Sequence, residues 1–461
     1  MTIEIKAKMN NILPLRNFNF HLKVFLFAAC TALQTRTSYT QTFYKDIAPI
    51  IHAKCTPCHR PGESAPFSLI SYDDVAKRTS FIKKVIQEGY MPPWKANNEY
   101  VHFANVRSLE PSEKQLIISW IDGKKERGKA KKSKVQTPYE VSGLTRTPDL
   151  TLMAQDTFVL QGDNNERFVV FKIPFELDAP ANIEAVEFVS NDKRVIHHAN
   201  YAVHEVADPT IDIRAAPRLI NLSDEARSLY DAYLPLKKVM TYYGGWIPGA
   251  SAETYPSGIG WVLPKRGIIL LTVHFGPSAI ERKSISGINL FFTNQPIERT
   301  VKVVSFGSGG IGENEIRPSF FMIPANKISS YSLKVSNPSE DFSALYVWPH
   351  MHYIGKEFKA YVVTPQNDTI PLVHIPEWDF RWQELYRFKN LVKIPKGSVI
   401  HLECSYDNTA DNPFNPFSPP ENIFSYSDMK TTQEMMTMLL VFLPYKEGDE
   451  FVSTSQKSLR E

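Results

Sequence analysis

Two cysteines and a histidine stand together in the stretch KCTPCHRPG, as Cys55, Cys58 and His59. Cys-x-x-Cys-His is the spacing of covalent haem attachment, in which both thiols bond to the haem and the histidine supplies an axial nitrogen to iron. A redox-active Cys-x-x-Cys or half of a zinc site would use the same cysteines. A redox pair does not need the histidine, and no second cysteine pair exists to complete a zinc site. The motif therefore predicts a c-type haem.

The residues around this motif favour a small helical haem domain. FYKDIAPIIHAKC has an amphipathic helix pattern leading into the motif, and SEKQLIISWIDGKK, capped by Ser112, predicts a closing helix. Between them, EGYMPPWKA places Met91 in a proline-rich turn, where its thioether is suited to bind iron opposite the imidazole. Residues 39–128 resemble a class I-type cytochrome c domain, which implies that Met91 and the three motif residues hold the haem.

Further along the chain, five histidines and a methionine form a second set of metal-binding side chains. They are His197 and His198 in VIHHANY, His274 in IILLTVHFGPS, His350 and His352 in WPHMHYIG, and Met435 in QEMMTMLLVFLPY. Adjacent histidines on a regular strand point to opposite faces, so the HH pair reaches one metal only where the strand ends or bulges. The HxH pair shares one face of a strand. Three imidazoles form a His₃ site, and two imidazoles with a thioether form a softer set suited to copper.

The order of these motifs resembles that of the copper type II, ascorbate-dependent monooxygenases, which include dopamine β-monooxygenase and peptidylglycine α-hydroxylating monooxygenase. Further matching stretches are GGWIPGAS at 244–251, VHFGPS at 273–278, HMHYIGK at 350–356 and CSYDNT at 404–409. QEMM at 433–436 occupies the position of the family's Asp-Glu-Met-Cys stretch. The likeness extends over roughly residues 149–446.

This resemblance implies two jelly-roll domains that carry one copper each and face one another across a solvent-filled cleft. His197, His198 and His274 would hold the electron-donating copper. His350, His352 and Met435 would hold the copper that binds O₂ and attacks a substrate C–H bond. Other histidines and methionines nearby are interpreted as structural: His204, His374 and His401 as surface residues, and Met436 and Met438 as core residues. An approach of His204 or Met438 to a copper stays open beside this interpretation.

The chain also departs from this family. It has only four cysteines and no disulfide framework, so Cys404 is interpreted as a buried small apolar residue. Where the peptide-amidating members carry an Arg, an Asn and a Tyr that hold the substrate, this chain has Trp348, Thr437 and Leu439. A carboxylate-ended peptide would lose its charge-assisted partner there. We therefore expect a small organic substrate of more apolar or aromatic character.

The elements that must position these side chains follow from composition and periodicity. Alternating apolar and polar runs broken by Gly, Pro, Asn and Asp predict all-β sandwiches of jelly-roll type after residue 148. The fold class is thus a small all-α domain followed by two all-β domains. The expected segments are 1–38 signal, 39–128 haem domain, 129–148 basic linker, 149–296 and 297–450 copper domains, and 451–461 polar tail. The linker is polar and long enough to let the haem approach the first copper domain.

The net charge and the N-terminal residues indicate which partners and which location to expect. A net charge of +3, with one dispersed basic run, does not predict nucleic-acid binding. Charged residues followed by VFLFAAC and small residues predict a secretory signal, and so a periplasmic or extracellular protein. Phe27–Cys30 also resembles a lipoprotein cleavage site, so a lipid anchor at Cys30 stays open beside simple cleavage.

The leading hypothesis is a haem- and copper-dependent monooxygenase that receives electrons from an external reductant or redox protein. Its path would run from haem to the His₃ copper and on to the His₂Met copper with O₂. Two alternatives remain: a non-catalytic electron-transfer or copper-binding protein, and a carbohydrate- or protein-binding sandwich. The last explains neither the haem motif nor the ordered histidines.

Overall fold

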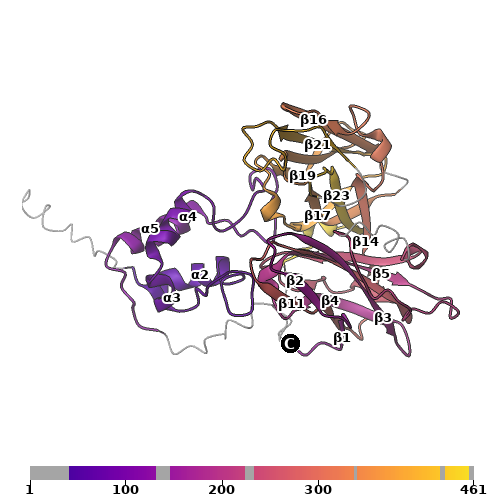
Figure 1. The fold of residues 1–461 in the computed structure, drawn as a ribbon, viewed down its shortest axis with the longest axis horizontal. Coiled ribbons are helices and arrows are strands. Elements are labelled where there is room, and N and C mark those ends of the chain that lie inside the picture. The colour runs from indigo at the N-terminus through magenta and orange to yellow at the C-terminus, as the bar shows by residue number, and fades with distance from the viewer. Residues whose placement is uncertain (1–40, 131–145, 224–232, 337–339, 426–430, 456–461) are drawn as a thin grey trace, which may run out of the picture. The chain divides into compact units, whose positions relative to one another are not determined.

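The computed structural model describes residues 41–130, 146–223, 233–336, 340–425 and 431–455. The chain divides into two compact units, Met1–Gln41 and Thr42–Glu461, and all described helices and strands belong to the second unit (Figure 1). The expected signal segment, including Cys30, lies outside the described residues, as do most of the basic linker and part of the polar tail.

The N-terminal part, residues 43–130, is called the helical segment. Its helices are η1 (Phe43–Ile47), α2 (Ala48–Lys54), α3 (Tyr72–Ala76), α4 (Thr79–Gln87) and α5 (Pro111–Asp122). The apolar faces of these helices meet in a common core, which buries Phe43 of η1, Ile51 of α2 and Trp120 of α5. Ser112 is not the cap of α5. Glu110 is its N-cap and Pro111, whose fixed φ suits the first turn, begins the helix.

Residues 150–300 form the first sandwich, which has two large sheets and a two-stranded ribbon. One sheet holds β1 (Leu150–Met153), β12 (Ser286–Phe292), β4 (Ala181–Ser190), β9 (Ile259–Leu263) and β13 (Arg299–Thr300), with β8 (Glu253–Thr254) on β4. The other holds β6 (Leu219–Asn221), β3 (Arg167–Glu176), β10 (Arg266–Phe275), β5 (Ile196–Glu205) and β7 (Met240–Trp246). The ribbon pairs β2 (Phe158–Gln161) with β11 (Glu281–Ser284).

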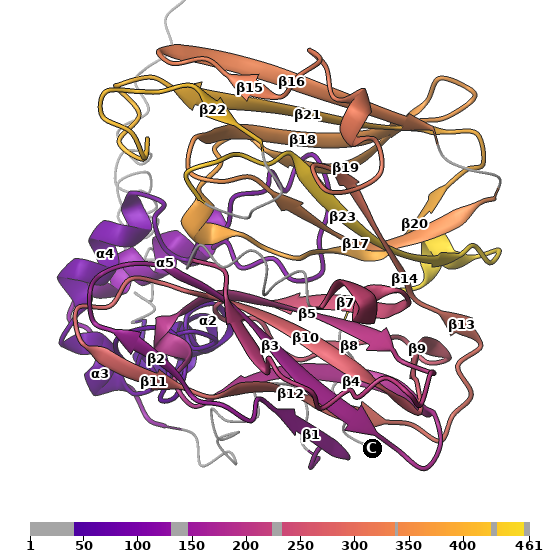
Figure 2. The same cartoon turned by 45° about the vertical axis from the view of Figure 1, so that its right-hand side comes forward.

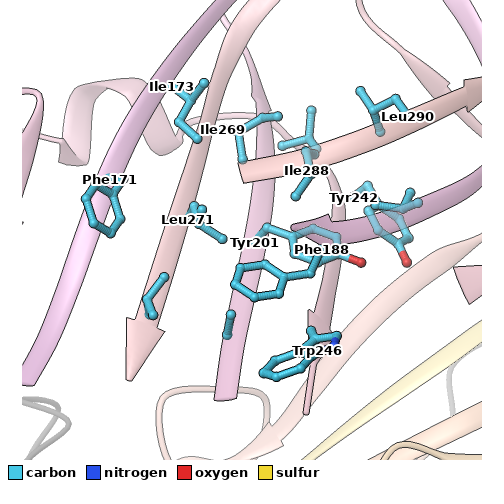
Figure 3. Packing of buried hydrophobic residues seen from close by; sticks show 14 of the residues in the cluster. Phe171, Ile173, Phe188, Tyr201, Tyr242, Trp246, Ile269, Leu271, Ile288 and Leu290 are labelled. Carbon is cyan, nitrogen blue, oxygen red and sulfur yellow. The ribbon is translucent and has the colours of Figure 1, made fainter. Parts of the chain in front are cut away.

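The core of the first sandwich follows from the period-two alternation of its strands. Phe171 and Ile173 of β3 and Leu271 of β10 point inward, where they meet Ile288 and Leu290 of β12 (Figure 3). The intervening positions of β3 and β10 pack under a second apolar cluster instead, formed with residues from the 206–236 region. This sheet is therefore buried on both faces, which explains why its strands read as nearly continuous apolar runs.

Residues 302–455 form the second sandwich (Figure 2). One sheet holds β14 (Lys302–Gly307), β23 (Thr437–Pro444), β17 (Phe342–His350) and β20 (Tyr386–Ile394). The other holds β16 (Lys327–Ser336), β21 (Val399–Asn408), β18 (Gly355–Val363) and β19 (Thr369–Ile375), and β15 (Met322–Ile323) pairs with β22 (Ile423–Phe424). Short turns of helix include η6 (Phe380–Trp382). Among the described strands, no sheet contains strands of both sandwiches. Because β13 pairs with β9 of the first sandwich, that sandwich extends to Thr300, a few residues beyond the expected 296.

The helical segment is joined to the second sandwich by backbone pairing. Ala104 N–H donates to Arg387 O at 2.8 Å, Lys389 N–H donates to His102 O at 3.0 Å, and Phe103 bridges Phe388. These residues add to β20, which is otherwise an edge strand of its sheet. The sequence suggested a tether that lets the haem segment approach. In the structure this segment is docked on β20 through residues 102–104. These three residues are extended, which the helical patterns on either side of them in the sequence do not indicate.

Candidate metal and haem sites

The haem motif lies at the end of α2. Cys55 is the C-cap of that helix, and both Cys55 and Cys58 are free thiols. His59 Nδ1 lies 3.1 Å from the Phe67 carbonyl oxygen, which leaves Nε2 as the ring nitrogen available to a ligand. Burial raises the pKa of the Cys55 thiol to about 12, and burial likewise raises the pKa of Cys58. A redox Cys-x-x-Cys depends on a lowered thiol pKa. The raised pKa values of Cys55 and Cys58 therefore do not favour thiol redox chemistry at this motif.

Met91 lies in the turn after α4, where its N–H donates to Val85 O at 3.1 Å. Residues 93–95 of the same turn line a cavity of about 10 Å³ that also borders His197 and His198. A cavity of this size holds about one water molecule. The turn that carries Met91 thus reaches the histidines of the first sandwich.

His197, His198 and His274, here called the triple-histidine cluster, meet where β5 and β10 pair. His274 lies opposite His198, whereas the next pair is Phe275 with Ile196, so His197 is the extra residue of a β-bulge. One ring nitrogen of each histidine lies within 4.8 Å of the others, and His197 Nδ1 is 3.0 Å from His198 Nδ1. The bulge required by the sequence argument is therefore present at the HH pair.

The electrostatics of the triple-histidine cluster favour neutral imidazoles. Burial lowers the pKa of His197 to about 4 and lowers the pKa values of His198 and His274 well below the ordinary histidine value. Nε2 of His197 and both ring nitrogens of His274 are buried without a hydrogen-bond partner. Buried nitrogens with free lone pairs are costly unless something coordinates them. The donor set fits a copper or zinc ion.

His350 and His352, with Met435, are called the histidine–methionine cluster. Strand β17 ends at His350, so His352 lies just beyond it and the HxH pair is not wholly within a strand as expected. The two ring centroids are nevertheless 5.0 Å apart. His350 Nδ1 lies 2.6 Å from Gln383 Oε1 and His352 Nδ1 lies 2.9 Å from Gln433 O. Both rings are thereby oriented through Nδ1, which leaves Nε2 for a metal.

A buried carboxylate ties the backbone of this cluster together. Glu434 Oε2 accepts hydrogen bonds from the N–H groups of His352 at 2.8 Å and Met435 at 3.1 Å, and its Oε1 accepts from Ile354 at 3.0 Å. Burial nevertheless raises the pKa of Glu434 to about 8. Met435 lies two residues before β23, which begins at Thr437. Glu434 therefore fixes the approach of the Met435 segment to the histidine turn.

The two clusters face each other directly. The His198 and His350 rings are 6.2 Å apart between centroids. Phe380 of η6 stacks on His197 at 5.0 Å and also lies 5.6 Å from His352. A solvent-filled cleft was expected here. The described residues instead fill the space with the Phe380 ring, which is only 4% exposed.

Glu166 connects the two clusters along another route. Its Oε2 lies 3.3 Å from His274 Nε2, without the geometry of a hydrogen bond, and Tyr353 donates its hydroxyl hydrogen to Oε1. Thr431 Oγ1 donates to Oε2 at 3.3 Å. A residue of the first sandwich is thus bound to the segments that flank His352 and Met435 in the second.

Several expectations about neighbouring residues need correction. His204 is buried, 4% exposed, rather than at the surface, and it pairs with Ile268 at the far end of β5, away from both clusters. Trp348, at the position where the peptide-amidating relatives hold substrate, packs between the sandwiches. Its ring lies over Gly245 of β7, where a Cβ would be 2.4 Å from the indole. Cys404 and Met438 are core residues, as expected.

Sequence reasoning did not single out Gln383, Phe380, Glu166 or Glu434. Glu434 carried a signal, since it is a carboxylate directly before the methionine at the start of an apolar run. Glu166 and Gln383 lie in loops and Phe380 in the three-residue η6, where no periodic pattern exists. Each meets its histidine through a contact between segments distant in sequence.

Comparison with known protein families gives a match in the second sandwich. Residues 314–415 match the sequence model of the copper type II ascorbate-dependent monooxygenase C-terminal domain. The match includes His350 and His352 and ends before Met435. Comparison with curated proteins gives no match.

Comparison with solved structures gives only distant likeness. An allantoicase is 10% identical with a TM-score of 0.16, covering 57% of this chain and 85% of its own. The allantoicase of Saccharomyces cerevisiae is 8% identical with a TM-score of 0.17, covering 66% and 86%. The VP2 subviral particle of infectious bursal disease virus is 9% identical with a TM-score of 0.17, covering 68% and 79%. The match over residues 314–415 is thus the finding that supports, for this chain, the family of copper type II ascorbate-dependent monooxygenases.

Proposed function

We propose that this protein is an exported haem- and copper-dependent monooxygenase that hydroxylates a C–H bond of a small organic substrate with O₂. The observation that carries the proposal is the close approach of two sets of histidines on separate sandwiches, with the ring centroids of His198 and His350 6.2 Å apart. A protein that only stores a metal needs one such set. The family match over the second sandwich supports copper as the metal.

In this proposal His197, His198 and His274 hold one copper, and His350, His352 and Met435 hold the other. Copper held by two imidazoles and a thioether would supply the one-electron chemistry that O₂ activation requires. The surrounding residues keep the imidazoles neutral by burial, orient His350 through Gln383, and hold the Met435 backbone through Glu434. The Phe380 ring lies between the clusters, in contact with His197 and His352.

Cys55, Cys58, His59 and Met91 would hold a haem, which would supply one-electron transfer. Cys58 Sγ lies only 2.4 Å from the position a Cβ would take on Gly249. Gly249 follows Trp246 by three residues, and Trp246 pairs with Ala199, the neighbour of His198. A short stretch of backbone therefore leads from the attachment site to the triple-histidine cluster, which supports a relay from haem to the first copper.

Docking of the helical segment gives this relay a fixed geometry. Arg107 donates from Nη1 to Pro248 O at 2.8 Å and pairs through Nη2 with Glu384 Oε2 at 2.8 Å. Lys193 of the first sandwich pairs with Glu63, close to the haem motif, at 3.1 Å. The contact thus includes two ion pairs of largely buried side chains.

Electron transfer without oxygenation is the second candidate, and one observation favours it. The cavity next to His197 and His198 has a volume of about 10 Å³, whereas sites for organic ligands are generally 300 Å³ or larger. A monooxygenase therefore requires η6 to move aside for substrate, and an electron carrier does not. Uptake of O₂ that depends on an added organic substrate separates the two candidates.

The location of the protein is also a proposal. The charged and apolar N-terminus supports export to the periplasm or the extracellular space, and a lipid anchor at Cys30 lies outside the described residues. In the described part of the chain, no helix has both the length and the apolarity to cross a membrane.

Metal stoichiometry tests the proposed sites directly. Iron and copper would be measured on mature protein from a host that attaches c-type haem, in the wild type, His197→Ala and His350→Ala. We expect one haem and two coppers, with each variant losing about one copper. His374→Ala is the matched control, because His374 pairs with Glu357 away from the clusters. Full copper content in both cluster variants would refute the assignment.

A further inference from the structure

The interface between the sandwiches contains a group of oxidisable aromatic residues that the proposed function does not use. All are buried or nearly so, and all are tyrosine or tryptophan: Tyr201, Tyr242, Tyr255, Tyr346, Trp261 and Trp348. Tyr346 projects from the second sandwich into the core of the first, where Leu345 and Val441 accompany it. Tyr201 and Tyr242 lie side by side on the paired strands β5 and β7 (Figure 3).

Two members of this group, Trp348 and Tyr346, lie on the same strand as His350 of the histidine–methionine cluster. Tyr346, Trp348 and His350 are alternate residues of β17, and their pairing with β23 is regular from Tyr346 to His350. Alternate residues of a strand share a face. This face meets the first sandwich at all three positions, since His350 faces His198 and Trp348 lies over Gly245. An oxidisable ring thus stands at each step from His350 to Tyr346.

From Tyr346 the group continues into the first sandwich. The Tyr346 hydroxyl lies 3.3 Å from that of Tyr242, which stacks on Trp261 with ring planes 2° apart and centroids 4.5 Å apart. The hydroxyls of Tyr255 and Tyr242 lie 2.7 Å apart. The hydroxyls therefore form a continuous hydrogen-bonded group in the shared core.

The carboxyl group of Glu253 lies next to two of these phenolic hydroxyls. Glu253 Oε1 accepts hydrogen bonds from Tyr346 and, at 2.9 Å, from Tyr255. Burial raises the pKa values of Tyr346 and Tyr242 well above the ordinary value, so both phenols are protonated at neutral pH. Removing an electron from a buried phenol leaves a cation unless the proton also departs. Glu253 provides the destination.

We propose that Trp348 and Tyr346 form a radical-transfer chain that carries an oxidising equivalent away from the histidine–methionine cluster, with Glu253 as the proton acceptor. One electron leaves Tyr346 for the oxidant and its phenolic proton moves to the Glu253 carboxylate, which gives a neutral tyrosyl radical and a carboxylic acid. The oxidant is of the class that copper(I) yields with hydrogen peroxide, so this part of the proposal rests on the proposed function. An external reductant returns the electron, and Glu253 returns the proton.

The chain ends where a small reductant has access. Tyr346 and Glu253 line a cavity of about 410 Å³, together with Ser251, Asn105 and Arg387. Such a cavity admits small molecules, whereas the histidine clusters are closed. The function of the radical-transfer chain would be to protect the histidine and methionine ligands from oxidation when the enzyme meets oxidant in the absence of substrate.

The chain is tested first without copper. Photogenerated tris(bipyridine)ruthenium(III) would oxidise the full-length, copper-free protein, and the tyrosyl radical would be followed by freeze-quench EPR. We expect a radical signal that is lost in Tyr346→Phe and reduced in Glu253→Gln. Tyr331→Phe is the matched control, because Tyr331 is a buried tyrosine whose hydroxyl donates to Met322 O in the second sandwich. An equal signal in Tyr346→Phe and Tyr331→Phe would overturn the chain.

The second measurement adds copper(I) and hydrogen peroxide to wild type, Trp348→Phe and Tyr331→Phe, with copper content determined on the same samples. The expected result is a tyrosyl radical in wild type and Tyr331→Phe, and its loss in Trp348→Phe, together with faster oxidation of His350 or Met435 by mass spectrometry. Copper binding with no radical would refute the link between chain and cluster. Absence of bound copper would instead count against the proposed function, because the copper-free experiment reports on the chain alone.

Discussion

Replacing Glu384 by glutamine should change how the stability of the folded protein depends on pH. Glu384 is 6% exposed and pairs with Arg107 at 2.8 Å, at the contact between the helical segment and the second sandwich. Burial raises the pKa of its carboxyl group from an ordinary 4.5 to about 7, and the attraction of Arg107 only partly opposes this rise. Burial is thus the dominant effect.

The sign and size of the effect follow from proton linkage. Because the folded-state pKa lies above the unfolded one, the folded state holds the proton more tightly, and this contribution to stability is complete below pH 4.5. It is lost as the pH rises through 7. A difference of about 2.5 pKa units corresponds to about 3 kcal/mol. The wild type should therefore lose about 3 kcal/mol relative to Glu384→Gln between pH 4.5 and pH 8.

Urea unfolding at a series of pH values, from 4 to 8, measures this difference. Histidine titrations contribute equally to wild type and variant and cancel in the comparison. Removing the guanidinium with Arg107→Met should raise the pKa of Glu384 further and widen the difference. Parallel stability curves for wild type and Glu384→Gln would refute the reasoning, and a wild type that gains stability with pH would mean that Arg107 outweighs burial.

Three more predictions concern the interface and the clusters. Gly245→Val should lower the melting temperature markedly, because its Cβ would lie 2.4 Å from a tryptophan ring, whereas Gly276→Ala has open space and should behave as wild type; equal melting temperatures would contradict this. Glu434→Ala should lower the free energy of unfolding by about 3 kcal/mol or more, since at least three buried N–H groups lose their acceptor, and urea titration checks this. Phe380→Ala should raise the pKa of His197 toward 6.5 in metal-free protein, measured by NMR titration, because water then enters; an unchanged pKa would count against burial as its cause.

Local patterns predicted the elements of this chain well and the contacts between them poorly. The helices at 43–54 and 111–122 and the strands that carry His274 and His350 follow from apolar periodicity. The bulge at His197 follows from chemistry, since two adjacent histidines cannot otherwise reach one ion. By contrast, the sequence shows of Trp348 only that it stands beside the HxH pair, where the peptide-amidating relatives have an Arg. Its actual neighbour, Gly245, lies about a hundred residues earlier.

Residues 380–384 illustrate why the rest of the site is invisible in a linear pattern. Within this loop Phe380 contacts both histidine clusters, Gln383 orients His350, and Glu384 pairs with Arg107 of the helical segment. Three functions depend on one short loop without periodicity, and each depends on a partner from a different part of the chain. The proton on Glu384, whose loss should destabilise the folded protein, therefore lies one residue away from the amide that orients His350. The same loop closes the space between the clusters, so any path for substrate into that space must displace the groups that also fix the helical segment.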